Sequence, residues 1–413
     1  MDSSLHERDR MDLNNDNSES LPADHSTVRV AHWAVRMLYF FFFAGMGLFF
    51  SFINVYYLSI GLSGMQIGIL GTIGPLVGVF SSILWGMASD RFGRPRLLFA
   101  MASVGALSAV AALAGTRIFV WIIPAVIWLS LFSNPMPAMM DSTTFRLLGD
   151  HPERYGRYRM FGTLGFILTS SLSGFLFERM GLVALFPAFG STIVLFLMTS
   201  FALPNTPIHL HTSPFDGLGG LVRQPLWLVF ALSIFLVWLA ANGAVNFIGV
   251  TIKTLGGSDR LIGINWAIAS SLELPVMWAS AYLLKRFGAV RLVTVGFLGY
   301  FLRILGFGLI PSAEWALLVN ILHVFSYVPA TIGSVAYANQ LAPPELKATS
   351  QGLLFAMMNL GSVFGALSGG WLFDQFGPPG LFRILAFVAL AGFFLFTLGR
   401  ASLKKLQLPG TAG

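Results

Sequence analysis

Five ionisable residues lie within, or at the ends of, long apolar runs in which charge is otherwise rare. Glu273, Arg303 and His323 lie inside such runs, whereas Asp141 ends one run and Arg159 begins the next. Burial in an apolar cavity raises the pKa of a carboxylic acid and a nearby arginine lowers it, so such a group can bind and release a proton. We therefore predict that these residues bind a solute, and that Glu273, then Asp141 and His323, couple its movement to protons.

Each of these residues also has a purely structural interpretation. Asp141 could lie among lipid headgroups, and Arg159 could anchor a helix end at the membrane surface. Glu273 and Arg303 could form a structural ion pair, and His323 could be a hydrogen-bonded residue of the core. Ionisable groups inside a membrane are costly and usually serve a function, which favours the functional interpretation.

The composition indicates a chain embedded in a lipid bilayer. Of its 413 residues, 55% are hydrophobic and 10% are charged, whereas about 25% are charged in soluble proteins. The absence of cysteine excludes disulfides, thiolate metal sites and cysteine nucleophiles. The net charge is +7, but the basic residues occupy short connections between apolar runs, so we expect no nucleic-acid partner.

Apolar runs of about 20 residues predict twelve membrane-spanning helices. The predicted spans are 33–58, 67–88, 97–114, 118–140, 157–177, 182–203, 226–252, 261–284, 290–310, 314–339, 348–373 and 379–398. The proline-containing connection 204–225 is predicted to be a cytosolic linker between two six-helix halves, 33–203 and 226–399. The polar segment 1–32 is predicted to be a disordered cytosolic tail, and 400–413 a second cytosolic tail.

Lysine and arginine indicate the orientation, because cytoplasmic connections carry an excess of both. One set of connections and the two terminal segments hold Arg8, Arg10, Arg29, Arg91, Arg94, Arg96, Arg146, Arg154, Arg157, Arg223, Lys285, Arg286, Arg291, Lys347, Arg400, Lys404 and Lys405. The opposite connections hold only Arg117, Arg179, Lys253 and Arg260. Both termini are therefore predicted to be cytosolic, in a plasma or inner membrane.

A four-residue pattern recurs at the end of the second, fifth, eighth and eleventh predicted spans. It reads Asp90-Arg91-Phe92-Gly93, Glu178-Arg179-Met180-Gly181, Lys285-Arg286-Phe287-Gly288 and Asp374-Gln375-Phe376-Gly377. A three-helix unit thus occurs four times, and alternate units cross the membrane in opposite directions because three is odd. Charge and glycine are also common at helix ends, which is the alternative explanation. The repeat predicts an all-α membrane protein with two six-helix halves, each an inverted pair of three-helix repeats.

Residues 86–96 read Gly-Met-Ala-Ser-Asp-Arg-Phe-Gly-Arg-Pro-Arg and resemble the loop motif of the major facilitator superfamily. A weaker copy follows at 285–291. The resemblance implies a cytoplasmic gate formed by Gly86, Asp90, Arg91, Gly93, Arg94 and Arg96. Residues 155–166 are similar to the start of the fifth helix in the proton-linked sugar, nucleoside and phenylpropionate permeases, the branch that includes lactose permease. The resemblance covers about 33–400.

The resemblance to that branch implies roles for the same five ionisable residues. A substrate-binding acid on the fourth helix and an arginine on the fifth match Asp141 and Arg159. A substrate-binding acid on the eighth helix matches Glu273. The arginine of the ninth helix and the histidine of the tenth match Arg303 and His323.

The departures from the branch concern the proton route and the sugar site. Ser326 replaces the proton-carrying glutamate one turn after the histidine, and Phe166 replaces the tryptophan that stacks on sugar. Because it occupies this stacking position, Phe166 is the sixth residue that we predict to bind the solute. Asn320 replaces a lysine, and Asn242 together with Asn246 replaces acids of the seventh helix. The joint loss of lysine and acids avoids an unpaired charge. The loss of the glutamate means that the family's usual proton carrier is missing.

We expect a monomeric secondary transporter, and not an enzyme, that carries a small polar or aromatic organic solute by rocking its halves about a central cavity. Proton symport is the expected mode, driven by an H+ gradient with no cofactor or metal. Proton-coupled efflux of drugs or sugars and uniport are alternatives on the same fold. A membrane enzyme or receptor is a more distant one, because the sequence has no metal-spaced His/Glu cluster, nucleotide-binding loop or Ser-His-Asp pattern.

Overall fold

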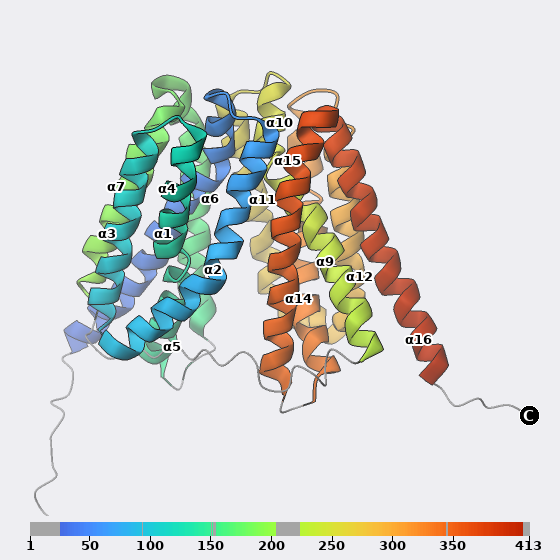
Figure 1. The fold of residues 1–413 in the computed structure, drawn as a ribbon. Helices are drawn as coiled ribbons and strands as arrows, with labels where there is room; N and C mark the ends of the chain where they lie inside the picture. Colours follow the sequence, from blue (N-terminus) through green and yellow to red (C-terminus); the bar gives the residue numbers. More distant parts are fainter. Residues whose placement is uncertain are drawn as a thin grey trace, which may run out of the picture.

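The computed structural model describes residues 25–92, 94–149, 151, 154–203, 224–343 and 346–407, which are helical apart from short connections (Figure 1). The first half contains α1 (His25–Ser59), α2 (Gly64–Phe92), α3 (Pro95–Ala114), α4 (Phe119–Ser133), α5 (Met136–Leu148), α6 (Tyr155–Met180), η2 (Leu182–Ala184) and α7 (Leu185–Ser200). The second half contains α9 (Pro225–Val245), α10 (Ile248–Thr254), α11 (Asp259–Trp278), α12 (Ser280–Phe307), α13 (Trp315–Asn320), α14 (His323–Leu341), α15 (Lys347–Phe394), η4 (Leu395–Gly399) and α16 (Arg400–Gln407).

Eleven helical segments of the described chain are long and apolar enough to cross a membrane. The last of them, Thr349–Leu403, contains two spans, because the backbone of α15 turns at Gly377 with φ 64° and ψ −176°. Glycine adopts this conformation readily, and Pro378 and Pro379 follow it. α15 therefore runs to one face of the bundle and returns (Figure 1), which confirms the predicted twelve-helix architecture.

Three described spans are broken between two α-helices at a residue that lies beside a cavity. The fourth span joins α4 to α5 across Asn134 and Pro135, since a proline cannot donate the helical hydrogen bond. The seventh span joins α9 to α10 at Asn246, and the tenth joins α13 to α14 just before His323. Asn134, Asn246 and His323 all line cavities. Irregular backbone inside a membrane is stable where it lines such a space.

Glycine allows close packing within each half. A Cβ atom at Gly165 of α6 would overlap the carbonyl oxygen of Phe40 in α1, and one at Gly365 of α15 would overlap that of Leu239 in α9. Membrane helices lack a hydrophobic drive to associate, so close backbone contact replaces it.

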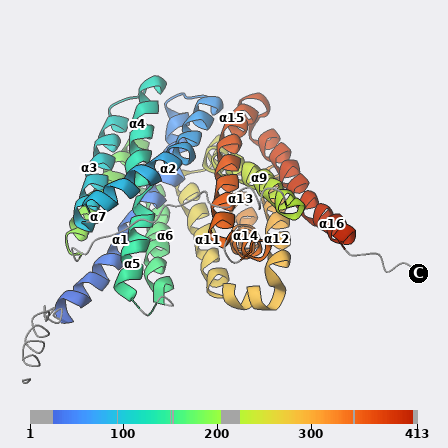
Figure 2. The ribbon, with the colours of Figure 1, turned by 60° about the horizontal axis from the view of Figure 1, so that its bottom comes forward.

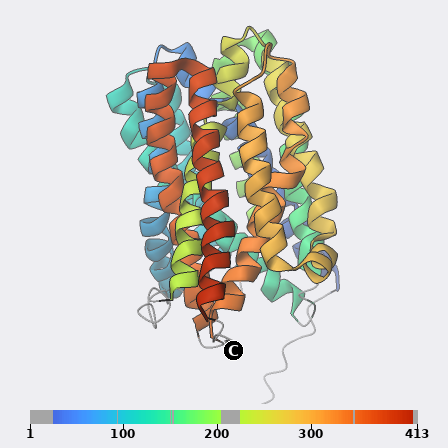
Figure 3. The same ribbon diagram turned by 90° about the vertical axis from the view of Figure 1, so that its right-hand side faces the viewer.

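The two halves converge at one face of the membrane-spanning bundle and diverge towards the other (Figures 1 and 2). α1 begins and α16 ends at the divergent face, and the helices of the second half run between the two faces (Figure 3). At the convergent face the backbones of the halves touch, because a Cβ atom at Gly263 would overlap the carbonyl oxygen of Ser170. The structure is thus closed at the face opposite the described chain ends.

The terminal segments are more helical than the sequence predicts. α1 begins at His25, so residues 25–32 are helix and not part of a disordered tail. Extending an existing helix costs little once its first turn has formed, and Ala31 is buried against the first half. At the other end α16 continues the last span to Gln407. The remainder of the predicted tails, 1–24 and 408–413, and most of the linker, 204–223, lie outside the described residues.

Candidate functional site

A cavity of about 460 Å³ lies between the two halves. Five of the six predicted binding residues line it: Arg159 and Phe166 from α6, Glu273 from α11, Arg303 from α12 and His323 from α14. The first half also contributes α1, and the second half α9, so side chains of both halves face one space. We call this space the central cavity.

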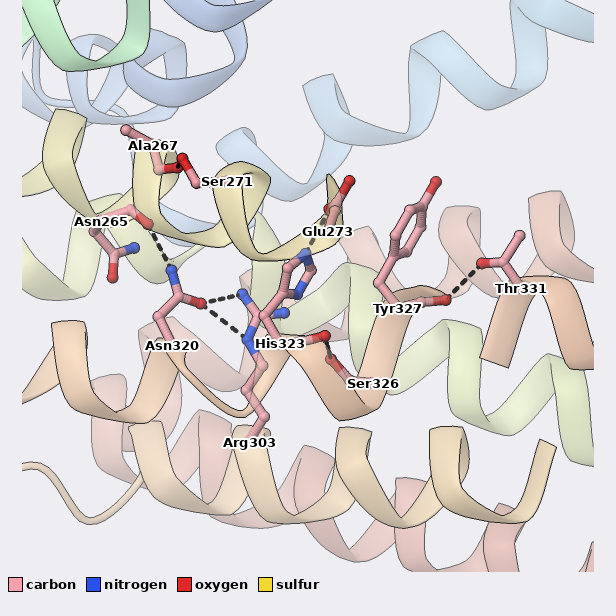
Figure 4. Close-up of polar contacts among 10 residues, drawn as sticks. All are labelled: Asn265, Ala267, Ser271, Glu273, Arg303, Asn320, His323, Ser326, Tyr327 and Thr331. Carbon is pink, nitrogen blue, oxygen red and sulfur yellow. Dashed lines mark hydrogen bonds and ion pairs between the residues drawn. The ribbon is translucent and has the colours of Figure 1, made fainter. Parts of the chain in front are cut away.

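Glu273 and His323 contact each other at the wall of the central cavity (Figure 4). Oε1 of Glu273 lies 2.6 Å from Nε2 of His323. His323 is buried, and its ring stacks on that of Tyr327 at a centroid distance of 5.9 Å. Nδ1 of His323 is buried and has no hydrogen-bond partner among the described residues. The carboxylate and imidazole thus form a pair that can share a proton.

Arg303 contacts an asparagine and not the carboxylate of Glu273 (Figure 4). Oδ1 of Asn320 accepts hydrogen bonds from Nε and Nη2 of Arg303, at 3.1 and 2.7 Å. Nδ2 of Asn320 donates to the carbonyl oxygen of Asn265, which fixes the direction of the amide. A neutral amide therefore orients this buried guanidinium without neutralising it.

Asp141 lies in α5 and is not among the residues that line the central cavity. The hydroxyls of Tyr39 and Tyr155 donate hydrogen bonds to its Oδ1, at 2.5 and 2.9 Å. The guanidinium of Arg159 lies instead 3.9 Å from the ring centre of Phe43. The carboxylate of Asp141, which the sequence predicted to lie in the cavity with Arg159, is thus hydrogen-bonded to two tyrosine hydroxyls.

The positions that depart from the permease branch have structural partners. The hydroxyl of Ser326 donates a hydrogen bond to the backbone carbonyl oxygen of His323 in the same helix. Nδ2 of Asn54 donates to both the backbone and the side-chain oxygen of Asn246, at 2.9 and 3.2 Å, which joins the two halves. Asn242 lines the central cavity and donates to the carbonyl oxygen of Trp238.

A family model described as the MFS_1 like family matches residues 32–384. The chain belongs to this family of the major facilitator superfamily. Maltose permease of Geobacillus stearothermophilus is 28% identical over 375 residues, which cover 88% of this chain and 93% of the permease. A protein named as a 3-phenylpropionic acid transporter of Escherichia coli (strain K12) is 25% identical over 367 residues, which cover 86% and 95%.

Solved structures with the same fold support this assignment. The nucleoside transporter NupG superimposes with a TM-score of 0.74 at 16% identity, over 90% of this chain and 99% of that one. A bacterial homologue of the lysosomal transporter Spinster gives 0.69 at 14% identity, over 92% and 98%. The protein is therefore a multi-pass membrane transporter of the major facilitator superfamily, and not an enzyme.

The sequence did not predict most of the aromatic residues that line the transporter's central cavity. Six further aromatic residues line the central cavity, namely Phe43, Phe50, Trp238, Trp266, Tyr300 and Tyr327. Aromatic residues make up 14% of the chain, so composition alone does not mark these six. Only Trp266 could have been predicted to line the cavity. It lies two helical turns before Glu273 on α11, so both side chains are on the same face of that helix.

The predicted cytoplasmic gate is only partly described. The side chains of Gly86, Asp90 and Arg91, and all of Gly93, lie outside the described structure, so their role stays a prediction. Arg94 is exposed just before α3, and Nε of Arg96 donates to the carbonyl oxygen of Leu203 beyond α7. Arg96 therefore ties the α2–α3 connection to the end of the first half.

Two acids of the four-residue repeat join the halves of the transporter at the convergent face. Asp374 of α15 accepts hydrogen bonds from the backbone N–H groups of Gly64 and Met65, at 2.6 and 2.8 Å. Glu178 of α6 accepts from the backbone N–H and from Nη2 of Arg260, at 3.2 and 2.9 Å. Each carboxylate thus caps the N-terminus of a helix in the other half, where the helix dipole favours negative charge.

Proposed function

We propose that this transporter moves a small organic solute together with protons by alternating access. The contact that carries the proposal is the 2.6 Å pair of Glu273 and His323, which faces a cavity lined by both halves. A carboxylate and an imidazole in contact can share one proton, so the pair offers a proton-binding position inside the cavity. The proton and the solute would then occupy the same cavity.

The cavity charges supply a means of coupling. Arg159, Arg303 and Glu273 line the central cavity, so cationic side chains outnumber carboxylates among the described residues of its wall. A proton on the Glu273–His323 pair makes this space more positive, which favours a negatively charged or acceptor-rich solute. By linkage, the bound solute favours the proton to the same extent.

The closed convergent face supports alternating access with the cavity open towards the chain ends. Most described lysines and arginines of the connections lie at the divergent face, including Arg94, Arg154 and Arg286, and cytoplasmic loops carry the excess of such residues. We therefore place both termini in the cytosol and regard the structure as the inward-facing state. Relatives named for maltose and 3-phenylpropionic acid support a small organic solute.

Uptake into proteoliposomes tests this function. Radiolabelled phenylpropionate, maltose and uridine serve as probes, with an imposed pH gradient that is acid outside. We expect one probe to accumulate above its external concentration and to be released when a protonophore is added. Accumulation that survives the protonophore, or that needs sodium, contradicts proton symport, and accumulation only with the opposite gradient indicates efflux.

The variant Glu273→Gln tests the coupling group. It keeps the shape and a hydrogen bond to His323 but cannot titrate, so uphill accumulation should be lost while exchange of labelled for unlabelled solute persists. Glu314→Gln changes an exposed carboxyl outside the cavity and is the control. If Glu273→Gln still accumulates solute and Asp141→Asn does not, the proton is carried in the first half.

A further inference from the structure

A second cavity of about 230 Å³ lies mainly within the first half, against α1, and Asn246 of the second half closes part of it. Its wall is more apolar than polar and includes six phenylalanines, namely Phe41, Phe42, Phe49, Phe50, Phe189 and Phe196. Asn54, Asn134 and Asn246 are among the polar residues that also line it. A dry cavity of about 150 Å³ with an apolar lining accommodates benzene in another protein, so this volume is sufficient for an aromatic ring. We call it the apolar cavity.

The apolar cavity adjoins the central cavity along one face of α1. Met46 and Phe50 line both spaces, so they form the boundary between them. Phe43, one turn earlier on the same face, lies beside the guanidinium of Arg159. From Phe43 to Phe49 in the wall of the apolar cavity the helix rises about 9 Å. A solute about 9 Å long would therefore be long enough to extend from beside Phe43 to the phenylalanine-lined space.

The two arginines of the central cavity have no carboxylate partner in the part of the chain that the structure describes. Among the described residues, no carboxylate oxygen lies within 4.0 Å of the guanidinium of Arg159 or Arg303. Arg303 is 4% exposed and bonded to a neutral amide, and Glu273, the one carboxylate among the described residues of the wall, contacts His323. Arginine cannot lose its proton in a protein, so its buried charge is stabilised by an anion.

Two donor groups of the same wall have no acceptor among the described residues. Nε1 of Trp266, which can only donate, is buried without a partner in the described structure. Arg159 contacts the rings of Phe43 and Tyr39, and the described residues offer it no hydrogen-bond acceptor. A ligand rich in acceptor oxygens would satisfy these donors, whereas a neutral polyol would leave both arginine charges without a counter-ion.

We propose that the solute is an organic monocarboxylate with an apolar, preferably aromatic, tail. Its carboxylate binds at Arg159 in the central cavity, and its tail enters the apolar cavity past Met46 and Phe50. The proposal rests on the proposed function in one respect, since it takes the central cavity as the transport site. It adds the charge of the solute and a second binding region.

Thermal stability of the purified full-length protein tests the charge, because a ligand that binds the folded state raises its Tm. The probes are phenylpropionate, indolepropionate and isocaproate, each paired with its uncharged amide. We expect each acid that binds to do so at least about tenfold more tightly than its amide, as for a hydrogen bond to a charged group. If no acid raises the Tm more than its amide, or if only maltose or uridine does, the proposal is wrong.

Matched variants locate the carboxylate. Arg159→Gln should remove the preference for acid over amide, whereas Arg159→Lys, which keeps the charge, should retain part of it. Arg157→Gln changes an exposed arginine two residues earlier in α6 and should leave the preference unchanged. An unchanged preference in Arg159→Gln overturns the assignment of the carboxylate.

A second pair of variants tests the tail. Val126 lines the apolar cavity, and its neighbour Ile127 is exposed on the same helix, so Val126→Phe fills the cavity while Ile127→Phe is the control. Val126→Phe should weaken phenylpropionate binding at least about tenfold, as expected for lost burial of a ring. Equal affinities of the two variants exclude the apolar cavity.

These measurements use detergent-solubilised protein without any gradient. A preference for acids therefore stands even if the vesicle experiment shows no proton coupling. Conversely, proton-driven uptake of maltose or uridine upholds symport and overturns the monocarboxylate.

Discussion

The contact between Asp374 and the N-terminus of α2 allows the stability of the closed face to be predicted. The carboxylate accepts two backbone N–H groups, from Gly64 and Met65, across the boundary between the halves. Asp374→Asn keeps one acceptor oxygen, so the variant loses one hydrogen bond and the interaction of the charge with the helix dipole. Asp374 is exposed, which places both contributions at the low end of their ranges, about 1.5 kcal/mol together. The population closed at this face should fall about tenfold relative to the open one.

Distances between two spin labels measure this population, and the chain has no cysteine that would interfere with labelling. Arg117→Cys and Pro311→Cys place one label on each half, in connections at the convergent face. Gln375→Ala, at the exposed neighbouring residue, is the control. We expect Asp374→Asn to broaden the distribution towards longer distances and the control to leave it unchanged. Identical distributions for both would refute the view that the carboxylate holds this face closed.

Three further predictions concern other parts of the molecule. Asn320→Leu should lower the free energy of unfolding by about 2–3 kcal/mol, because the buried guanidinium of Arg303 loses both of its hydrogen bonds to Asn320. In denaturant titrations, the double variant with Arg303→Met should recover most of this loss. A double variant that recovers none of it would contradict the prediction. Green fluorescent protein fused to the C-terminus should fluoresce and alkaline phosphatase should be inactive there, whereas the reverse would place the termini outside the cytosol. Asp90→Asn should slow transport several-fold and leave ligand affinity within a few-fold; a large loss of affinity at unchanged turnover would exclude a gating role.

The fold follows from the sequence because each of its main features has a local signal. Apolar runs of bilayer length give the spans, and the four-residue repeat gives the three-helix unit. Gly377 and its two prolines mark the last turn in the sequence as they do in the structure. The start of α1 is less predictable, since residues 25–32 are polar enough for a tail and become helical as an extension of a buried span.

The candidate site is only partly predictable, because its contacts depend on how each helix is rotated. Sequence reasoning selects Glu273, Arg303 and His323, and all three line one cavity. It does not identify Asn320 as the partner of Arg303, since that contact depends on the break between α13 and α14. The partners of Asp141 include Tyr39, 102 residues earlier, and no local pattern reveals such a contact. The apolar cavity likewise arises from the packing of several helices.

The buried and interfacial charges of the two regions differ, because carboxylates join the halves at the closed face whereas arginines from both halves line the central cavity. At the closed face the carboxylates of Glu178 and Asp374 meet helix N-termini, so negative charge is already satisfied there. In the cavity Arg159 and Arg303 belong to different halves and have no carboxylate partner among the described residues. An anion bound near both favours states in which the halves approach each other around it, whereas the caps favour the present state. A ligand shifts such an equilibrium only by its difference in affinity between the two states. Because the cap at Asp374 contributes only about 1.5 kcal/mol, a difference of about tenfold in anion affinity is enough to offset it.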